Sequence, residues 1–196
     1  GCRNMIFLTF GTGLGAGLIL NGELYSGTNG MAGEAGHIRL AEDGPVGYGK
    51  AGSFEGFCSG GGIAQLGQVM AEEALDREEI PSFCQSKGEL FKVNARTIAE
   101  AAEKGDPLAL KIYDIVADRL GQGLAILVDL LNPEKIVIGS IFLRQEKLLR
   151  PRMEKILNKE SLEQSLSVVE VLPAGLGEKL GDYAAVSVGL RAYQKK

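Results

Sequence analysis

Two runs of apolar residues, separated by a glycine-rich segment, open the sequence. Met5 to Phe10 and Leu14 to Leu20 are rich in the aliphatic residues that β-strands favour. The second run is followed at once by Asn21-Gly22, a pair that between strands is typical of a type I′ turn. The pattern predicts a strand, a tight glycine turn, a second strand and a further hairpin turn.

Three later segments carry the apolar spacing of amphipathic helices. The first follows the glycines at 60–62 and ends before Pro81. Asn94 has the position of an N-cap for the second. The third begins at Asp106-Pro107, with a cap and a first-turn proline, and continues to Asn132-Pro133. Because its second half is apolar on nearly all sides, we expect this helix to lie in the core.

Two short β-branched runs alternate with the helical segments. Lys135 to Ile138 ends in Gly139-Ser140, a pattern typical of a buried strand whose C-terminal end opens onto a ligand crevice. Ser167 to Leu172 predicts one more strand, and Asp182 is placed to cap a closing helix through Leu190. This order of elements favours an α/β or α+β fold.

Composition and charge narrow the class of protein. With 196 residues, 45% of them hydrophobic and 23% charged, the chain is long enough to bury a core, and a single domain is expected. A formal net charge of −4 and a sequence pI near 5.2 argue against a broad nucleic-acid surface, because no block of basic residues could neutralise a row of phosphates. We therefore expect no nucleic-acid contact through this region.

The cysteines and the longest apolar helix indicate a cytoplasmic setting. Cys2, Cys58 and Cys84 are widely spaced, which predicts neither a disulfide framework nor a local zinc knuckle. The sequence starts without a signal-peptide pattern, and the longest apolar helix carries several charges, so we expect no membrane contact. Those charged residues are Asp114, Asp118, Arg119 and Asp129.

The glycine turn carries the first candidate chemistry. Glycines at every second position from Gly11 to Gly17 remove side-chain bulk, so backbone N–H groups could approach a phosphate. The alternative is that these glycines only let two strands curve past another backbone. A dinucleotide fingerprint is disfavoured because a strand, not a helix, follows. The segment 44–51 resembles a Walker A loop, but Ala51 stands where a hydroxyl is needed and no buried strand precedes it.

Glu34 and His37, the only histidine, lie three residues apart in a second glycine-rich segment, Gly27 to Ile38. Small neighbours leave both side chains free to converge on a ligand, although such a pair taken alone is more often an ordinary surface pair.

The order and spacing of these segments resemble the ROK family, which comprises sugar kinases and sugar-responsive repressors of the actin-like ATPase superfamily. The resemblance covers essentially the whole chain. It is carried by the glycine turn that follows Phe10, the pair Asn21-Gly22, the segments 29–30 and 33–37, and several later motifs. These later motifs are Gly105-Asp106-Pro107, Leu130 to Pro133, Ile136 to Gly139 and Leu180 to Ala185.

The resemblance implies a ribonuclease-H-like lobe in which helices pack on a mixed sheet. It implies that residues 1–196 form the C-terminal lobe of a two-lobe sugar kinase, with ATP and a hexose or amino-hexose bound between the lobes. Gly11, Thr12 and Gly13 match a phosphate loop of the family, and Gly139 with Ser140 matches its adenosine-side turn. The residues that match sugar-binding positions are Asn29, Glu34, His37 and Glu55. Carboxylates and an imidazole suit this role because they hydrogen-bond vicinal hydroxyls directionally.

One departure from the family pattern concerns zinc. The family usually carries a C-x-C-G-x-x-G-C motif, whereas the matching stretch here is Val46 to Ser53 and contains no cysteine. His37 would be the only remaining ligand, so we expect no structural zinc, a loop held by packing, and an imidazole left for the sugar.

The second departure concerns catalysis. The family's catalytic aspartate lies in an Asn-Asp-x-Asn stretch of the N-terminal lobe, and nothing here matches it. Because Met5 is not the first residue and a strand begins almost immediately, we expect a piece of a longer protein. We expect no catalytic residue in this chain and little ATP turnover by it alone, although ATP and Mg²⁺ remain the implied cofactors.

A sugar-sensing lobe of a transcriptional repressor is the main alternative. A DNA-binding helix-turn-helix would lie outside this region, so the residues at hand leave that possibility open. The phosphate-loop residues favour the kinase, and the loss of the zinc cysteines disfavours the repressor branch. A third possibility is that this region serves mainly for oligomerisation, with its apolar helices pairing between subunits. The homodimer that the resemblance implies fits either function.

Overall fold

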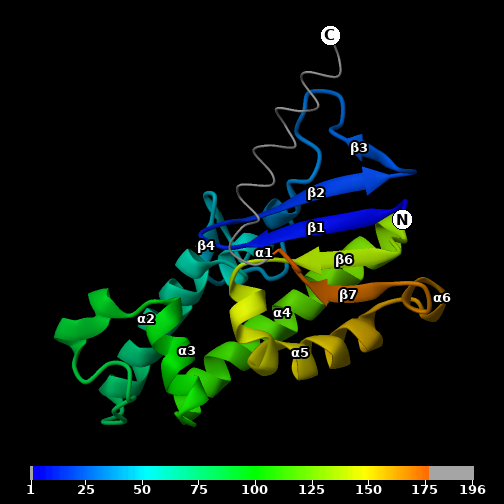
Figure 1. The fold of residues 1–196 in the computed structure, drawn as a ribbon. Coiled ribbons are helices and arrows are strands. Elements are labelled where there is room, and N and C mark those ends of the chain that lie inside the picture. Colours follow the sequence, from blue (N-terminus) through cyan, green and yellow to red (C-terminus); the bar gives the residue numbers. More distant parts are fainter. Residues whose placement is uncertain (1, 177–196) are drawn as a thin grey trace.

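A five-stranded sheet with the order β3-β2-β1-β6-β7 forms the centre of the structure (Figure 1). The computed structural model describes residues 2–176. β1, β2 and β3 pair antiparallel, whereas β1, β6 and β7 pair parallel, so the sheet is mixed, as expected. The strands are β1 (Met5–Phe10), β2 (Leu14–Leu20), β3 (Glu23–Tyr25), β6 (Lys135–Ile138) and β7 (Glu170–Pro173).

The first hairpins have the predicted bounds. In the β1–β2 register Phe10 lies opposite Leu14, so the turn consists of residues 11–13. Asn21 and Gly22 have φ angles of 56° and 86°, the paired positive values that a type I′ turn requires. The Asn-Gly pair therefore correctly predicts the turn that joins β2 to β3.

The last strand differs from its predicted bounds. It begins at Glu170 rather than Ser167, because α6 (Glu163–Leu166) ends there and Ser167 N–H donates to Glu163 O at 3.0 Å. Pro173, one residue beyond the predicted end, is the last strand residue and pairs with Ile138. The predicted closing helix, Asp182 to Leu190, lies outside the described residues.

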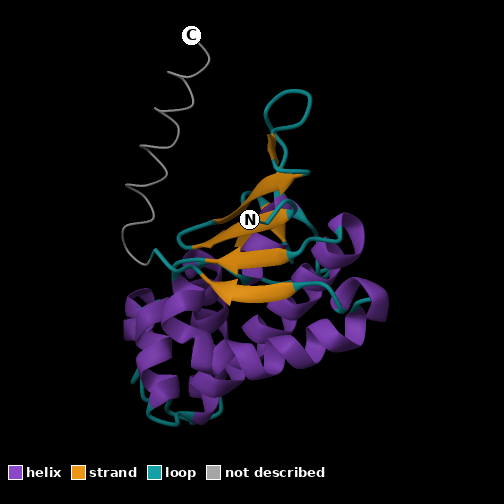
Figure 2. Cartoon of the chain, turned by 45° about the vertical axis from the view of Figure 1, so that its right-hand side comes forward, coloured by secondary structure: helices purple, strands orange, loops and turns teal. Residues whose placement is uncertain are grey.

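The helices lie together on one side of the sheet, while β3 and the loop that follows it project from the far edge (Figure 2). All three predicted helices are present, and the Walker-like segment 44–51 forms a two-stranded hairpin instead of a phosphate loop. The remaining elements are η1 (Ala35–His37), β4 (Val46–Gly47), β5 (Lys50–Ala51), α1 (Phe54–Phe57), α2 (Gly60–Asp76), η2 (Lys87–Lys92), α3 (Ala95–Glu103), α4 (Pro107–Leu131) and α5 (Ile141–Glu160).

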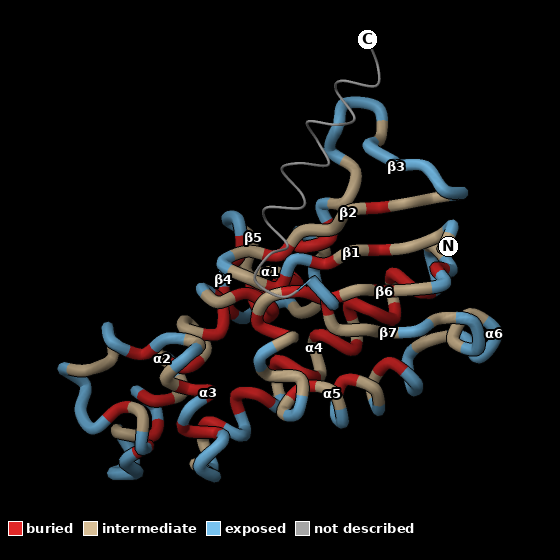
Figure 3. Tube along the Cα trace, in the orientation of Figure 1, coloured by how far each residue is buried: buried red, intermediate tan, exposed pale blue. Residues whose placement is uncertain are grey.

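The core lies between the sheet and α4. Ile6, Leu8 and Phe10 are fully buried on one face of β1, and the second half of α4 is buried along most of its length, as predicted (Figure 3). Leu120 and Leu124 of α4 are both 0% exposed. Within residues 2–176, no helix is long and apolar enough to cross a membrane.

Asp106 caps α4 and fixes the preceding loop, and its loss is expected to cost about 1 kcal/mol of stability. One carboxylate oxygen accepts from Leu108 N and Ala109 N at 3.0 and 2.9 Å, and the other accepts from Ser82 N at 2.7 Å. Burial alone would raise the pKa of Asp106, but these hydrogen bonds outweigh it and hold the pKa below its ordinary value.

Because the folded-state pKa lies below the unfolded one, the contribution is complete above about pH 5 and is lost as the pH falls through ~4 and below. Urea unfolding at pH 7 and pH 3 checks this, since Asp106→Ala should narrow the stability difference between the two pH values. Asp106→Asn keeps an acceptor for the cap and should lose less at pH 7. An equal difference in wild type and Asp106→Ala would contradict the expectation.

Candidate functional site

A cavity of about 840 Å³ opens where β1 and β6 end. The β1–β2 turn forms one wall through Gly11 and Thr12, and Ser140, which follows β6, lies on the same cavity. The structure thus brings together three of the residues expected at the nucleotide site, from segments that are about 130 residues apart in sequence. The other lining residues are Gly60, Gly61, Asn94, Ala95, Arg96, Ala99, Glu100, Glu103, Tyr113, Ile141, Arg144 and Gln145.

The N-termini of three helices border this cavity. Gly60 and Gly61 begin α2, Ala95 begins α3, and Ile141 begins α5. The positive ends of helix dipoles favour an anion. α2 is a 17-residue helix, whereas α5 has a kink at Gln145, close to its start. Ser140 makes no side-chain capping bond to α5, whereas Ser59 accepts from Gly62 N–H of α2 and Asn94 accepts from two first-turn N–H groups of α3. Of these three helices, α5 alone begins without a side-chain cap.

Hydrogen bonds fix the β1–β2 turn against α2. Gly11 N–H donates to Gly13 O at 3.0 Å, and Gly60 N–H donates to Gly11 O at 2.7 Å. A Cβ on Gly11 would lie 3.3 Å from the hydroxyl oxygen of Ser140, so side-chain bulk here would press on the opposite wall. The glycine at position 11 keeps that approach open.

Ser140 has a strained backbone. Its φ and ψ are 58° and −111°, a conformation that L-residues rarely adopt. Such strain clusters at ligand sites because the surrounding structure must over-determine it. Gly139, expected to share this role, is buried and continues the sheet, since its N–H donates to Leu8 O at 3.0 Å. Of these two residues, Ser140 lines the cavity, whereas Gly139 lies behind it in the sheet.

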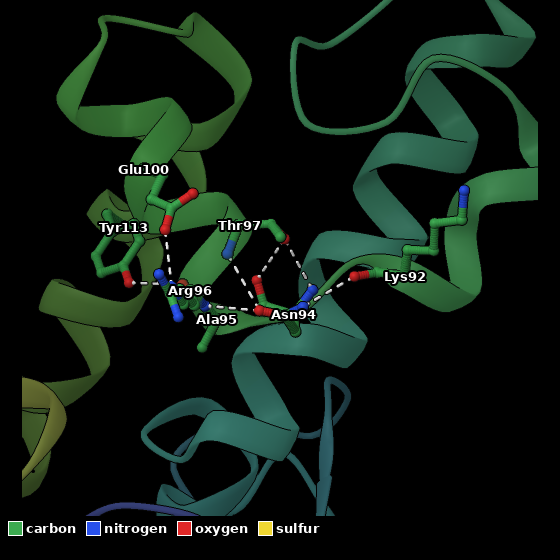
Figure 4. A network of polar contacts seen from close by, with 7 residues as sticks. All are labelled: Lys92, Asn94, Ala95, Arg96, Thr97, Glu100 and Tyr113. Carbon is green, nitrogen blue, oxygen red and sulfur yellow. Dashed lines mark hydrogen bonds and ion pairs between the residues drawn. The ribbon is translucent and has the colours of Figure 1, made fainter.

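The wall formed by α3 and α4 was not predicted from the sequence. Figure 4 shows Asn94 capping α3, Arg96 pairing with Glu100 at 2.8 Å, and the Tyr113 hydroxyl donating to Ala95 O at 3.2 Å. Burial raises the pKa of Tyr113, and the negative charge of Glu103 raises it further, so the phenol stays protonated at neutral pH. The Asn94 cap signal located the start of α3 but gave no sign that it borders a cavity.

Glu55 lies between the glycine turn and the segment 33–37. Its carboxylate accepts from Leu14 N–H at 2.9 Å, and a Cβ on Gly13 would lie 2.8 Å from the same oxygen. A Cβ on Gly36 would lie 3.2 Å from the Glu55 Cβ. Gly13 does not line the cavity but makes room for this carboxylate. The glycine turn, expected to bind phosphate, and the segment 33–37, expected to bind sugar, therefore both contact the side chain of Glu55.

The remaining sugar-site candidates lie outside the cavity. Glu34 and His37 are exposed at the two ends of η1, which packs beside β2, and Ala16 N–H donates to Gly33 O at 2.7 Å. Asn29 is exposed in the loop after β3, where its side chain accepts from Met31 N–H at 3.3 Å. Gly36, between Glu34 and His37, thus packs against Glu55, while Asn29 lies in the loop after β3. Their role in sugar binding stays a prediction.

The cysteines do not form a metal centre in the described part of the chain. Cys58 is fully buried and its thiol donates to Val116 O at 3.7 Å, and burial raises the pKa of this thiol well above its ordinary value. Across residues 2–176, no group of three or more His, Cys, Asp or Glu side chains could hold a metal ion.

Curated proteins of two kinds are similar to this chain. It is 37% identical over 154 residues to a glucokinase from Halalkalibacterium halodurans, a match that covers 77% of this chain and 46% of that protein. It is 31% identical over 190 residues to the DNA-binding transcriptional dual regulator NagC of Escherichia coli, covering 94% of this chain and 44% of the regulator. The chain thus spans about half the length of the curated relatives it matches.

Solved structures divide in the same way. A ROK family glucokinase from Streptomyces griseus in complex with glucose and AMPPNP is 29% identical and matches 91% of this chain and 58% of its own with a TM-score of 0.75. A ROK family transcriptional regulator, a homologue of the E. coli Mlc protein, is 27% identical and matches 87% of this chain and 41% of its own with a TM-score of 0.72.

These likenesses confirm the expected fold, an actin-like α/β fold in which helices pack on a mixed sheet. The model of the ROK family matches residues 1–188, nearly the whole sequence. The chain therefore belongs to the ROK family.

Proposed function

We propose that this chain is the sugar- and nucleotide-binding lobe of an ATP-dependent sugar kinase that phosphorylates a hexose or amino-hexose. One observation carries the proposal. The glycine turn borders a cavity ringed by helix N-termini on one side and contacts Glu55, beside the Glu34–His37 segment, on the other. Phosphoryl transfer requires the phosphate donor and the hydroxyl acceptor to be bound next to each other, as sites on the two sides of one turn would be.

Each wall of the cavity has a distinct task in this proposal. The positive ends of α2 and α5 and the backbone around Thr12 hold the phosphates of ATP. The wall of α3 and α4, with Arg96, Glu100 and Tyr113, offers polar groups to the nucleoside. Mg²⁺ neutralises charge on the phosphates when bound, and phosphate oxygens would supply most of its ligands, since it usually needs few protein ligands.

Sugar recognition falls to the opposite side of the turn. Glu34 and His37 hydrogen-bond the hydroxyls, and Glu55 ties their segment to the phosphate turn. The catalytic aspartate would come from an N-terminal lobe paired with this one, which makes residues 1–196 the C-terminal lobe of the whole enzyme. The chain alone would then bind its ligands and transfer phosphate slowly or not at all.

A sugar-sensing lobe of a repressor is the second candidate. The similarity to NagC extends over 94% of this chain, and a glucokinase from Thermotoga maritima matches 96% of it, so the extent of similarity does not separate the two functions. Both functions require sugar binding, so sugar affinity alone does not separate them. Nucleotide binding does, because a sensor has no need of ATP.

Titration of the chain with AMPPNP and Mg²⁺ is expected to show binding that Thr12→Asp weakens by tenfold or more. A carboxylate at position 12 would face the bound phosphates and repel them. Thr28→Asp is the matched control, since Thr28 is also exposed but lies outside the cavity. Calorimetry measures both affinities. Sugar binding without nucleotide binding would favour the sensor, and equal nucleotide affinity in the two variants would overturn the assignment of the turn.

A further inference from the structure

The β4–β5 hairpin is anchored beside the candidate sugar site. The side chain of Gln65 in α2 donates to Val46 O and accepts from Val46 N–H, both at 3.0 Å. Gly47 packs directly on α1, where a Cβ at position 47 would lie 2.5 Å from Gly56 N and 2.8 Å from the Glu55 Cβ. The base of the hairpin is thus fixed against the helix that carries Glu55.

The tip of the hairpin reaches His37. The Tyr48 ring meets the His37 ring edge-on, with 6.3 Å between centroids and 80° between planes. Lys50 Nζ donates to His37 O at 2.7 Å, so the hairpin contacts both the main chain and the imidazole of this residue. These two contacts hold Tyr48 and His37 as neighbours.

Tyr48 is held in an exposed and unfavourable position. Tyr48 is 89% exposed. Its φ of 43° lies in the left-handed region, which is uncommon for a bulky residue. Neither packing nor turn chemistry requires an aromatic ring at this tip, where Asn or Gly would serve the backbone better. An exposed ring fixed beside a polar ligand-binding group has the character of a ligand contact.

We propose that Tyr48 is a substrate-contacting residue that forms an aromatic wall of the sugar site. A pyranose ring has hydroxyls around its rim and an apolar C–H face, so full recognition needs polar partners and a flat apolar surface. Glu34 and His37 supply the polar partners, and the Tyr48 ring covers the C–H face. This inference rests on the proposed sugar binding and adds to it a residue that selects pyranoses by the shape of that face.

Calorimetric titration with glucose and with N-acetylglucosamine tests the contact in three variants. Tyr48→Ala should weaken binding of the recognised sugar about tenfold, the loss expected for one aromatic contact. Tyr48→Phe keeps the ring and should bind within about twofold of wild type. Phe91→Ala is the matched control, since Phe91 is another largely exposed aromatic residue, 78% exposed, in η2. It should bind like wild type.

NMR gives a second measurement that does not depend on affinity. The chain contains one histidine, so its imidazole signals identify themselves. Tyr48→Ala should shift the His37 signals because the neighbouring ring current is lost, and Tyr48→Phe should leave them near wild type. Saturation transfer from the protein to sugar C–H protons, which does require binding, should weaken in Tyr48→Ala and persist in Tyr48→Phe.

The outcomes separate this inference from the proposed function. If wild type binds a sugar, Glu34→Ala loses it and Tyr48→Ala does not, Tyr48 is not a contact and the proposed function stands. If wild type binds neither sugar, the proposed sugar site fails and the Tyr48 contact fails with it. Parallel losses in Tyr48→Ala and Glu34→Ala, with Tyr48→Phe and Phe91→Ala unchanged, support both.

Discussion

Replacing Gly36 with alanine is expected to destabilise the protein by about 3 kcal/mol and to abolish sugar binding. A Cβ at this position would lie 2.1 Å from Leu14 O and 3.2 Å from the Glu55 Cβ. The first of these atoms belongs to the backbone of β2, so no side-chain rotation can relieve the overlap. The segment that carries Glu34 and His37 would have to move away from the phosphate turn.

Gly17→Ala is the matched control for this prediction. Gly17 also lies at β2, but a Cβ there would meet no atom within 4 Å. Its stability should remain within about 1 kcal/mol of wild type, and a small gain is expected because alanine restricts the unfolded chain. Urea unfolding followed by circular dichroism measures both variants. If Gly36→Ala unfolded at the same urea midpoint as wild type, η1 would not pack tightly on β2.

Local signals in the sequence were sufficient to predict the elements whose boundaries depend on a few neighbouring residues. The Asn21-Gly22 turn and the Asp106-Pro107 start of α4 are set by backbone preferences of the residues themselves, and the structure has both where expected. The buried second half of α4 was predictable for a related reason, because a helix that is apolar on nearly all sides has no stable place at a surface.

Elements whose signals compete were harder to predict. α5 was not singled out, because its surface is rich in charge and it contains Pro151, which usually ends a helix. The helix continues past this residue because Leu149, Met153 and Leu157 are buried against the core. Tertiary packing thus overrode the proline signal in α5. The first residues of the strand expected from Ser167 instead form the turn that ends α6, where Ser167 N–H donates to Glu163 O and Val169 N–H donates to Leu166 O.

The candidate site shows the same division between local and long-range information. The glycine turn, Ser140 and the Glu34–His37 segment each carried a recognisable pattern. The cavity itself depends on α3 and α5 meeting the turn, a long-range arrangement for which no sequence period gives a sign. The hydrogen bond from Leu14 to Glu55, 41 residues further along, is equally invisible in the sequence, although Glu55 was assigned to the sugar by resemblance.

Glu55→Ala is expected to weaken sugar binding by about 10- to 100-fold and to lower stability by about 1–3 kcal/mol. The stability loss arises because Leu14, only 5% exposed, would keep a buried N–H without its carboxylate acceptor. The affinity loss arises because the same carboxylate links the glycine turn to the sugar segment. Calorimetry and urea unfolding measure the two effects separately.

Two further variants assign each effect to its cause. Glu55→Gln keeps an oxygen that can accept from Leu14 N–H, so it should retain most of the stability while losing sugar affinity with the charge. Glu34→Ala, at an exposed residue, should lose sugar affinity with stability within about 0.5 kcal/mol of wild type. If Glu55→Gln bound sugar as wild type does, the carboxylate would serve only to hold the turn, and sugar recognition would rest on Glu34 and His37 alone.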